Sequence, residues 1–234
     1  KIPRLKIPSM KMSDGPNGVR GDSTSGKSSA CFPCPISLGS TWNKELINKI
    51  GIALGQEALD KDVDVLLGPT INLHRHPLGG RHFENFSEDP VLTGEIAVAY
   101  VKGVQSKKVS ACLKHFVAND TEFERHTVSS NLDERTLREI YLLPFEMGIK
   151  KAKAKSVMSA YNKLNNIYCS SNKDLLIDIL KKEWGFDGYV VSDWGAALET
   201  VDNATGGLDM EMPGPGNTWG CLLYTSDAAD ETGR

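Results

Sequence analysis

One carboxylate in this sequence is accompanied by cations and aromatic side chains that each follow an apolar run. Asp193 ends the run Gly188-Tyr-Val-Val-Ser, and the indole of Trp194 comes directly after it. The cations and hydroxyl donors that follow earlier runs are Arg81, Lys114, His115, Arg125 and Tyr161. Arginine and lysine donate charge-assisted hydrogen bonds to hydroxyl groups, and an aromatic face packs against the apolar side of a sugar ring. These residue types predict a monosaccharide pocket.

Within such a pocket, Asp193 would act as a nucleophile. Neighbouring cations favour the ionised form of a carboxylate, which a nucleophile requires at neutral pH. Each residue also has a simpler interpretation. Asp193 could cap the next helix, Arg81 could be a surface charge, Lys114 an edge residue, and Tyr161 a core ring. Because polar and charged residues of these types recur after successive strands, we favour a sugar-binding site over these structural roles.

Strand-like and helix-like segments alternate along the chain. We expect strands at 63–68, 109–115, 156–161 and 188–193, and helices at 42–61, 89–106, 132–153 and 173–184. A further helical stretch is expected from about residue 196. Residues 1–40 are rich in Gly, Pro and Ser and are expected to be mostly loop. Alternation of this kind predicts parallel strands joined by right-handed helical crossovers.

The fold class that fits best is α/β, a (β/α)8 TIM-barrel-like domain that is incomplete at both ends, because candidate site residues recur after successive strands. A doubly wound sheet is the alternative, but the Gly-rich phosphate loop expected after its first strand is missing. We expect residues 1–216 to form the partial barrel that carries the nucleophile. Residues 217–234 do not continue the pattern and are similar to read-through of a sequencing adapter.

Composition excludes several classes of partner. The 234 residues carry a formal net charge of −3, so no basic surface is expected for nucleic acid. No apolar run approaches the roughly 18 residues that a membrane helix needs. The N-terminus has no signal-peptide core and reads like a start in mid-chain, so localisation is not predicted.

Metal and thiol sites are also not expected. His74, His76 and His82 with Glu84 suggest a metal site, but their loop spacing fits no common ligand pattern. Cys31-Phe-Pro-Cys34 has the spacing of a redox or metal motif. It lies in a Pro-rich segment, and none of the other cysteines, Cys112, Cys169 and Cys221, provides a second pair at zinc spacing.

Six collinear motifs carry a resemblance to a known family. They are Asp14-Gly-Pro-Asn-Gly-Val-Arg20, Gly79-Gly-Arg-His-Phe-Glu-Asn-Phe-Ser-Glu-Asp-Pro90, Lys114-His-Phe116, Ser159-Ala-Tyr-Asn162, Ser192-Asp-Trp194 and Gly207-Leu-Asp-Met-Glu-Met-Pro213. Over about residues 10–216 the sequence resembles glycoside hydrolase family 3, and within it the β-glucosidase branch.

The resemblance implies a retaining, exo-acting β-glycosidase that needs no cofactor and hydrolyses terminal non-reducing β-D-glucosyl residues of oligosaccharides or aryl β-glucosides. Asp193 would form the covalent glycosyl-enzyme. The residues that the resemblance places around the sugar are Asp14, Arg81, Lys114, His115, Arg125, Met158, Tyr161 and Trp194. It further implies a cis peptide bond between Lys114 and His115.

The departures from the family pattern define the alternatives. In this family the acid/base glutamate usually comes from a downstream α/β sandwich domain, which we expect in the full-length chain but do not find here. The 234 residues alone are therefore expected to be inactive. A β-xylosidase of the same family stays open, with Asp14 at the 6-hydroxymethyl group as the discriminating residue. An N-acetylglucosaminidase is disfavoured by Ser192-Asp-Trp194, and a non-catalytic sugar-binding or degenerate fragment is the remaining alternative.

Overall fold

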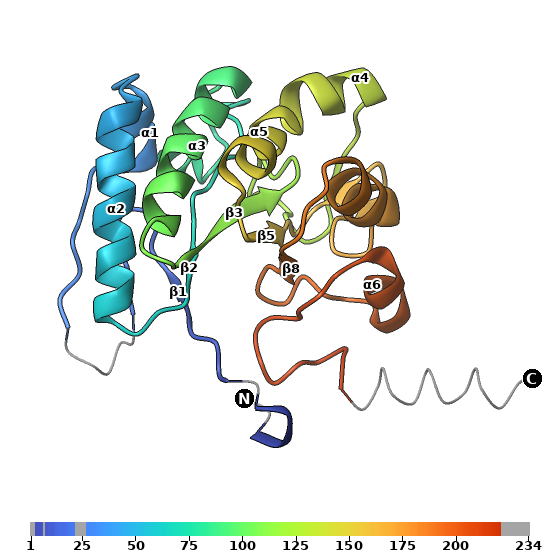
Figure 1. Cartoon of the computed structure of the whole chain (residues 1–234). Helices are drawn as coiled ribbons and strands as arrows, with labels where there is room; N and C mark the ends of the chain where they lie inside the picture. Colours follow the sequence, from blue (N-terminus) through green and yellow to red (C-terminus); the bar gives the residue numbers. More distant parts are fainter. Residues whose placement is uncertain (1–2, 7, 22–26, 221–234) are drawn as a thin grey trace, which may run out of the picture.

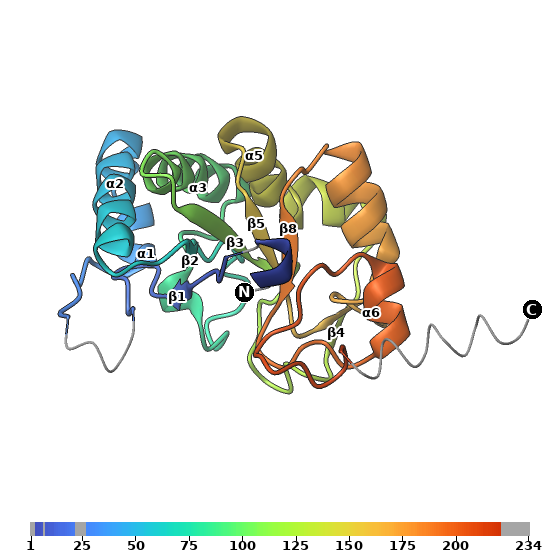
Figure 2. The ribbon, with the colours of Figure 1, turned by 60° about the horizontal axis from the view of Figure 1, so that its bottom comes forward.

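The computed structural model describes residues 3–6, 8–21 and 27–220, and a sheet of five parallel strands lies at its centre. In spatial order the strands are β1 (Met12–Asp14), β2 (Val65–Leu67), β3 (Ser110–Phe116), β5 (Ser156–Ser159) and β8 (Tyr189–Ser192). The sheet curls from β1 to β8 like part of a barrel wall (Figure 2). The predicted barrel-like α/β architecture is present as this curved parallel segment.

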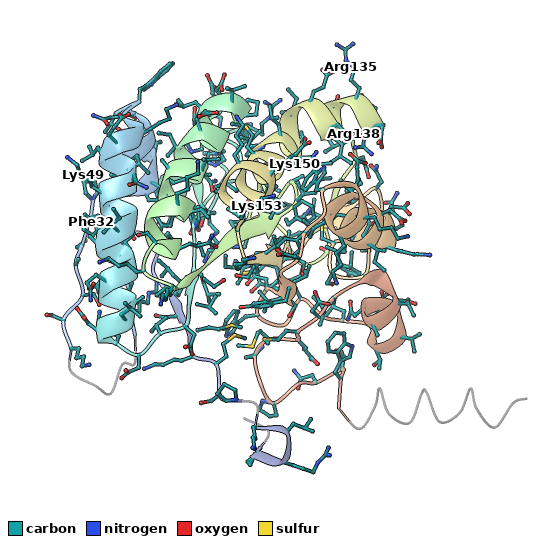
Figure 3. All side chains as sticks on the ribbon, viewed as in Figure 1. Phe32, Lys49, Arg135, Arg138, Lys150 and Lys153 are labelled. Atoms are coloured by element: carbon teal, nitrogen blue, oxygen red, sulfur yellow. The ribbon has the colours of Figure 1, made fainter. Side chains whose placement is uncertain are left out.

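Helices α2 (Lys44–Asp60), α3 (Pro90–Gln105) and α5 (Leu143–Ala152) cover one face of the sheet (Figure 1). The spatial order of the five strands follows the sequence order without reversal. A doubly wound sheet would reverse its strand order and carry helices on both faces, so that alternative is wrong. Exposed charged side chains such as Lys49 and Lys150 lie on the outer helices (Figure 3).

Local sequence explains where the outer helices begin and how closely they pack. The Asn43 side chain accepts a hydrogen bond from Leu46 N at 2.9 Å, so it caps the start of α2. Helices α2 and α3 meet at two glycines. A Cβ atom on Gly51 would lie 2.5 Å from Tyr100 O, and one on Gly103 would lie 2.4 Å from Asn48 O. Only glycine allows the two backbones to approach this closely.

The sheet separates two apolar clusters of different size. The larger cluster fills the space between the sheet and the outer helices, and it includes the predicted face of α2 with Ile47 and Leu54, both fully buried. The smaller cluster lies on the inner face of the strands and consists of Val65, Leu67, Cys112, Met158 and Val191. Burial of apolar surface on both faces explains why these strands read as continuous apolar runs.

The main differences from the sequence expectations lie at the N-terminus and in the helix expected at 132–153. Residues 1–40 were expected to be mostly loop, but β1 pairs with β2 from Met12 to Asp14, and α1 spans Pro35–Gly39. The helix at 132–153 is divided into α4 (Glu134–Thr136), the π-helical η3 (Leu137–Tyr141) and α5. Pro144 has no N–H to continue an α-helical ladder, so a wider turn precedes it.

The remaining elements are short 3₁₀ segments, a second small sheet, and the helical segments on either side of β8. The short 3₁₀ segments are η1 (Pro3–Leu5) and η2 (His82–Glu84). A second, small sheet, which the sequence did not predict, contains β4 (Ser129–Ser130), β6 (Lys163–Leu164) and β7 (Ile167–Tyr168). The π-helical η4 (Asp174–Glu183) precedes β8, and α6 (Thr200–Gly206) follows it.

Only the first part of the expected tail at 217–234 is described. The backbone N–H groups of Asn217, Thr218 and Trp219 donate to the Glu211 carboxylate. Cys221 lies outside the described residues. Across the described part of the chain, every helix falls short of the length and apolar character needed to span a membrane.

Candidate active site

The carboxyl ends of the central strands surround a pocket with a volume of about 400 Å³. Every residue that the sequence analysis assigned to the sugar site lies in its wall. The lining consists of Met12, Asp14, Arg20, Leu67, Arg81, Lys114, His115, Arg125, Met158, Tyr161, Asp193 and Trp194. Because the parallel strands end at the same edge, side chains from distant parts of the sequence meet there.

Asp193 occupies the position directly after β8, and its side chain is only 10% exposed. Its backbone N–H donates to Ser159 O of the neighbouring strand at 3.2 Å. Its Oδ1 atom accepts a hydrogen bond from Trp194 N at 2.8 Å. Its Oδ2 atom accepts no hydrogen bond from the described residues, so this oxygen is free to react with or bind a ligand.

His115 faces this free oxygen, with Nε2 3.4 Å from Asp193 Oδ2. Asn72 fixes the orientation of His115. It accepts from His115 N at 2.9 Å and contacts His115 Nδ1 at 3.1 Å through the same Oδ1 atom, while its amide donates to His115 O at 2.8 Å. Because that Oδ1 can only accept, the proton resides on Nδ1 and Nε2 presents a lone pair.

His115 is therefore a neutral acceptor and forms no ion pair with Asp193. Burial, followed by the positive charges of Arg81, Lys114 and Arg125, holds the pKa of His115 well below its usual value. Two acceptor atoms, His115 Nε2 and Asp193 Oδ2, thus lie side by side. A hydroxyl group of a ligand is the kind of donor that fits between them. The peptide bond between Lys114 and His115 is cis, as the resemblance implied.

Lys114 and Asp14 form an ion pair between β3 and the end of β1. Lys114 Nζ lies 2.9 Å from Asp14 Oδ1, and Arg20 Nη1 lies 3.7 Å from Asp14 Oδ2. Burial alone would raise the pKa of Asp14, but the charges of Lys114 and Arg20 outweigh it and lower that pKa. Asp14 is therefore an ionised hydrogen-bond acceptor, and it is a poor proton donor.

The two arginines come from the loops after β2 and β3. Arg81 pairs with Glu84, whose other oxygen accepts from Thr70 Oγ1 at 3.1 Å. Arg125 donates to Glu122 at 2.6 Å, and its guanidinium lies 4.4 Å from the centre of the Tyr161 ring. Each arginine keeps donors for a ligand while a carboxylate fixes its direction.

Tyr161 and Trp194 form the aromatic part of the wall. The Tyr161 hydroxyl donates to Trp194 O at 3.0 Å. Burial, followed by the negative charge of Asp193, raises the pKa of Tyr161 to about 12, so it remains a hydrogen-bond donor at neutral pH. Trp194 is 40% exposed and can offer its ring to a ligand.

The cations act on Asp193 in the expected direction, but burial outweighs them. Burial raises the pKa of Asp193, and the Trp194 N–H, Lys114 and Arg81 oppose this rise without reversing it. In addition, the cations have carboxylate partners of their own. Lys114 pairs with Asp14 and Arg81 with Glu84, so their pull on Asp193 is divided.

Comparison with known proteins identifies the family. The model of the glycosyl hydrolase family 3 N-terminal domain matches residues 1–211. The chain belongs to glycosyl hydrolase family 3.

Family 3 relatives agree in name and in fold. The chain is 57% identical to a β-glucosidase of Rhizobium radiobacter, with 92% of this chain and 26% of the relative covered. It is 52% identical to the probable β-glucosidase I of Neosartorya fischeri, with 95% of this chain and 27% of the relative covered.

A solved β-glucosidase of Kluyveromyces marxianus in complex with glucose has a TM-score of 0.95 and 45% identity, with 99% of this chain and 28% of that chain covered. β-Glucosidase 3B of Thermotoga neapolitana in complex with glucose has a TM-score of 0.92 and 47% identity, with 99% and 34% covered. The chain thus spans about a quarter to a third of these proteins.

Three lining residues of this family 3 pocket were missed from the sequence: Met12, Arg20 and Leu67. Met12 and Leu67 belong to β1 and β2, and β1 was not expected. Arg20 stands inside the first quoted motif, so its charge was a usable signal. Asn72 was missed as well, because a lone amide in a loop gives no sign that it orients a histidine.

The candidate metal ligands make other contacts. His74 Nε2 lies 2.9 Å from His82 O and 3.1 Å from Asn85 O, and His82 Nε2 lies 2.6 Å from His76 O. These contacts hold the loop after β2, and Glu84 pairs with Arg81. Within the described ranges, no three His, Cys, Asp or Glu side chains are grouped to hold a metal ion. Cys31 and Cys34 are free thiols in the described structure.

Proposed function

We propose that this chain is the part of a retaining, exo-acting β-glucosidase that binds the terminal β-D-glucosyl residue and supplies the nucleophile, Asp193. The observation that carries the proposal is the free Oδ2 atom of Asp193 in a pocket lined by Lys114, Arg81 and Arg125. The relatives named β-glucosidase, two of them solved with glucose, support the same activity.

In the proposed first step, Asp193 Oδ2 attacks the anomeric carbon of the sugar. The bond from that carbon to the glycosidic oxygen breaks, its electron pair remains on the leaving oxygen, and an acid protonates that oxygen. The product is an ester between the sugar and Asp193. Water then attacks the same carbon, loses a proton to the acid/base residue, and releases glucose and the free carboxylate.

The general acid of this reaction is proposed to be a glutamate of a downstream α/β sandwich domain. Among the described residues, Asp14 is the only other carboxylate in the pocket lining. Its lowered pKa makes it unsuitable as an acid. Glu211 is unsuitable for the same reason, since backbone N–H groups outweigh burial and lower its pKa. In this proposal residues 1–216 are the nucleophile-bearing part of a (β/α)8 barrel, and 217–234 lie outside the domain.

The sugar ring is proposed to lie against Trp194 and Met158, with its hydroxyl groups on Asp14, Lys114, His115, Arg81, Arg125 and Tyr161. Asp14 would accept the 6-hydroxyl group, which glucose has and xylose lacks. The substrates are then oligosaccharides or aryl β-glucosides, and no cofactor takes part. The names of the relatives support glucose, and they give the β-xylosidase alternative no support.

The test uses an aryl 2-deoxy-2-fluoro-β-glucoside with a dinitrophenolate leaving group, which departs without an acid. Intact-mass analysis should show one sugar per chain, and peptide mapping should place it on the peptide that contains Asp193. Asp193→Asn should lower labelling by at least about 10⁴-fold, because an amide is a poor nucleophile. Glucose binding without any label would contradict the enzymatic proposal and favour a non-catalytic sugar-binding protein.

A further inference from the structure

The two pocket arginines each pair with a carboxylate from their own loop, but the two carboxylates differ in their contacts. Both oxygens of Glu84 are engaged, one with Arg81 and one with Thr70. Glu122 Oε2 accepts from Arg125 at 2.6 Å, whereas Glu122 Oε1 is buried and accepts no hydrogen bond from the residues that the structure describes. Glu122 itself is absent from the pocket lining.

Glu122 touches the loop of the other arginine as well as its own. Gly80, directly before Arg81, has a φ angle of +84°, and a Cβ atom there would lie 2.9 Å from Glu122 Cγ. The glycine therefore allows the Glu122 side chain to pack on the loop after β2. The charge of Glu122 also reaches Arg81: burial alone would lower the pKa of Arg81, and Glu84, Glu122 and Asp193 together raise it.

We propose that Glu122 is a positioning residue that ties the loops after β2 and β3 together, orients Arg81 and Arg125 toward the sugar, and limits the positive charge that Asp193 experiences. The inference rests on the function proposed above. Its geometric basis is the contact of one carboxylate with Arg125 on its own loop and with Gly80 on the neighbouring loop.

The consequence for Asp193 follows from the groups that face it. These are His115, Lys114, Arg81 and Tyr161. His115 is neutral, and Lys114 is paired with Asp14. Arg81 is paired with Glu84, and the charge of Glu122 adds to its neutralisation. Removing the Glu122 charge leaves Arg81 a stronger cation, which favours the ionised form of Asp193.

The variant that isolates this effect is Glu122→Gln, because glutamine keeps the shape and one acceptor oxygen but removes the charge. Glu124→Gln is the matched control, since Glu124 lies two residues away on the same loop and is exposed. Gly80→Ala is a second variant that displaces the Glu122 side chain and leaves its charge in place. Circular dichroism of all variants checks that the fold is retained.

Two readouts are measured on the full chain. The first is the NMR spectrum of the guanidinium N–H groups, with signals assigned through Arg81→Lys and Arg125→Lys. Glu122→Gln and Gly80→Ala should shift or broaden both arginine signals, and Glu124→Gln should leave them unchanged. The second is the pH dependence of labelling by the activated fluoroglucoside. Glu122→Gln should move the acidic limb to lower pH and weaken sugar binding about tenfold, while Gly80→Ala should weaken binding without that downward shift.

The two readouts separate the inference from the function on which it rests. Unchanged signals of Arg81 in Glu122→Gln would overturn the positioning role, whatever the labelling shows. An acidic limb that stays in place, with wild-type labelling intact, would overturn the charge-limiting role. If the wild-type chain takes no label at all, the proposed nucleophile fails, and the arginine spectra still decide whether Glu122 orients the two side chains.

Discussion

The pocket has two halves that are built in different ways. Lys114, His115 and Asp193 stand in or directly after central strands, and the side chains of Lys114 and Asp193 are only 5% and 10% exposed. Arg81 and Arg125 stand on the loops after β2 and β3, with side chains 26% and 34% exposed. The strand half is fixed by parallel pairing, and the loop half is fixed by ion pairs and ring contacts.

This difference predicts that substitutions in the two halves affect different properties, namely the reactivity of Asp193 and the affinity for the ligand. Charges in the strand half interact in a low-dielectric environment, so a change there should affect the reacting carboxylate strongly. Charges in the loop half are better solvated and should affect mainly how tightly a ligand is held. Three substitutions test this comparison, and they begin with the one for which we expect the largest effect.

Lys114→Met should have the largest effect, because it removes the buried cation of the strand half. Labelling by the activated fluoroglucoside should fall by about 10² to 10³-fold, because methionine cannot donate to the sugar and leaves Asp193 without this neighbouring cation. Since Lys114 lowers the pKa of Asp193 against the effect of burial, its loss should move the acidic limb of labelling to higher pH. Lys102→Met, at an exposed position on α3, is the control. A fall in labelling of less than threefold would contradict the predicted difference between the two halves.

Asp120→Asn should have an intermediate effect on stability. Asp120 Oδ1 accepts from Leu73 N at 3.3 Å and so joins the loops after β2 and β3. Burial raises the pKa of Asp120 to about 6, so its contribution to stability is present below its unfolded pKa and is lost as pH rises through about 6.

The free energy of unfolding of the wild type should therefore drop by about 1–3 kcal/mol between pH 4 and pH 7, relative to Asp120→Asn. Urea titrations across this pH range measure the difference. Asp202→Asn, at an exposed position on α6, should run parallel to the wild type. If the free energy of unfolding of Asp120→Asn and of the wild type changed with pH in the same way, the proposed role of Asp120 in joining the two loops would be contradicted.

Arg125→Lys should have the smallest effect. Lysine cannot donate in a planar fork or stack in the same way on the Tyr161 ring. Half-saturation for the fluoroglucoside should rise about five- to tenfold, while the limiting rate of labelling stays within about twofold. Arg135→Lys, on the exposed helix α4 (Figure 3), is the control. A fall in the limiting rate instead would place Arg125 at the reacting centre.

The parts of the fold that periodicity could predict are the long, repeated ones. The spacing of Ile47 and Leu54 predicted the buried face of α2, and the apolar run before Asp193 predicted a buried strand. β1 could not be predicted in this way, because three residues carry no period and only pairing with β2 makes them a strand. The π-helical turn before Pro144 depends on a register of hydrogen bonds that composition does not encode.

The site could be predicted to a similar extent. Residue types after strands indicated Arg81, Lys114, Arg125, Tyr161 and Asp193, whereas Asp14 and Met158 came from the resemblance alone. What the sequence could not supply is the partner of each charge. Asn72 on His115, and the carboxylates on the arginines, are known only from three-dimensional contacts. The sequence also did not indicate that burial would outweigh the cations and raise the pKa of Asp193.

One contact links the outer layer to the pocket. Tyr100 lies on α3 and is fully buried, and its hydroxyl donates to Pro16 O at 2.8 Å, in the loop that follows Asp14. A helix that never meets the ligand thereby shares a fixed point with a wall of the pocket. For anyone who redesigns the sugar preference by directed evolution, the useful positions extend to this helix. A library confined to the lining would omit Tyr100, whose hydrogen bond to Pro16 holds the loop that follows Asp14.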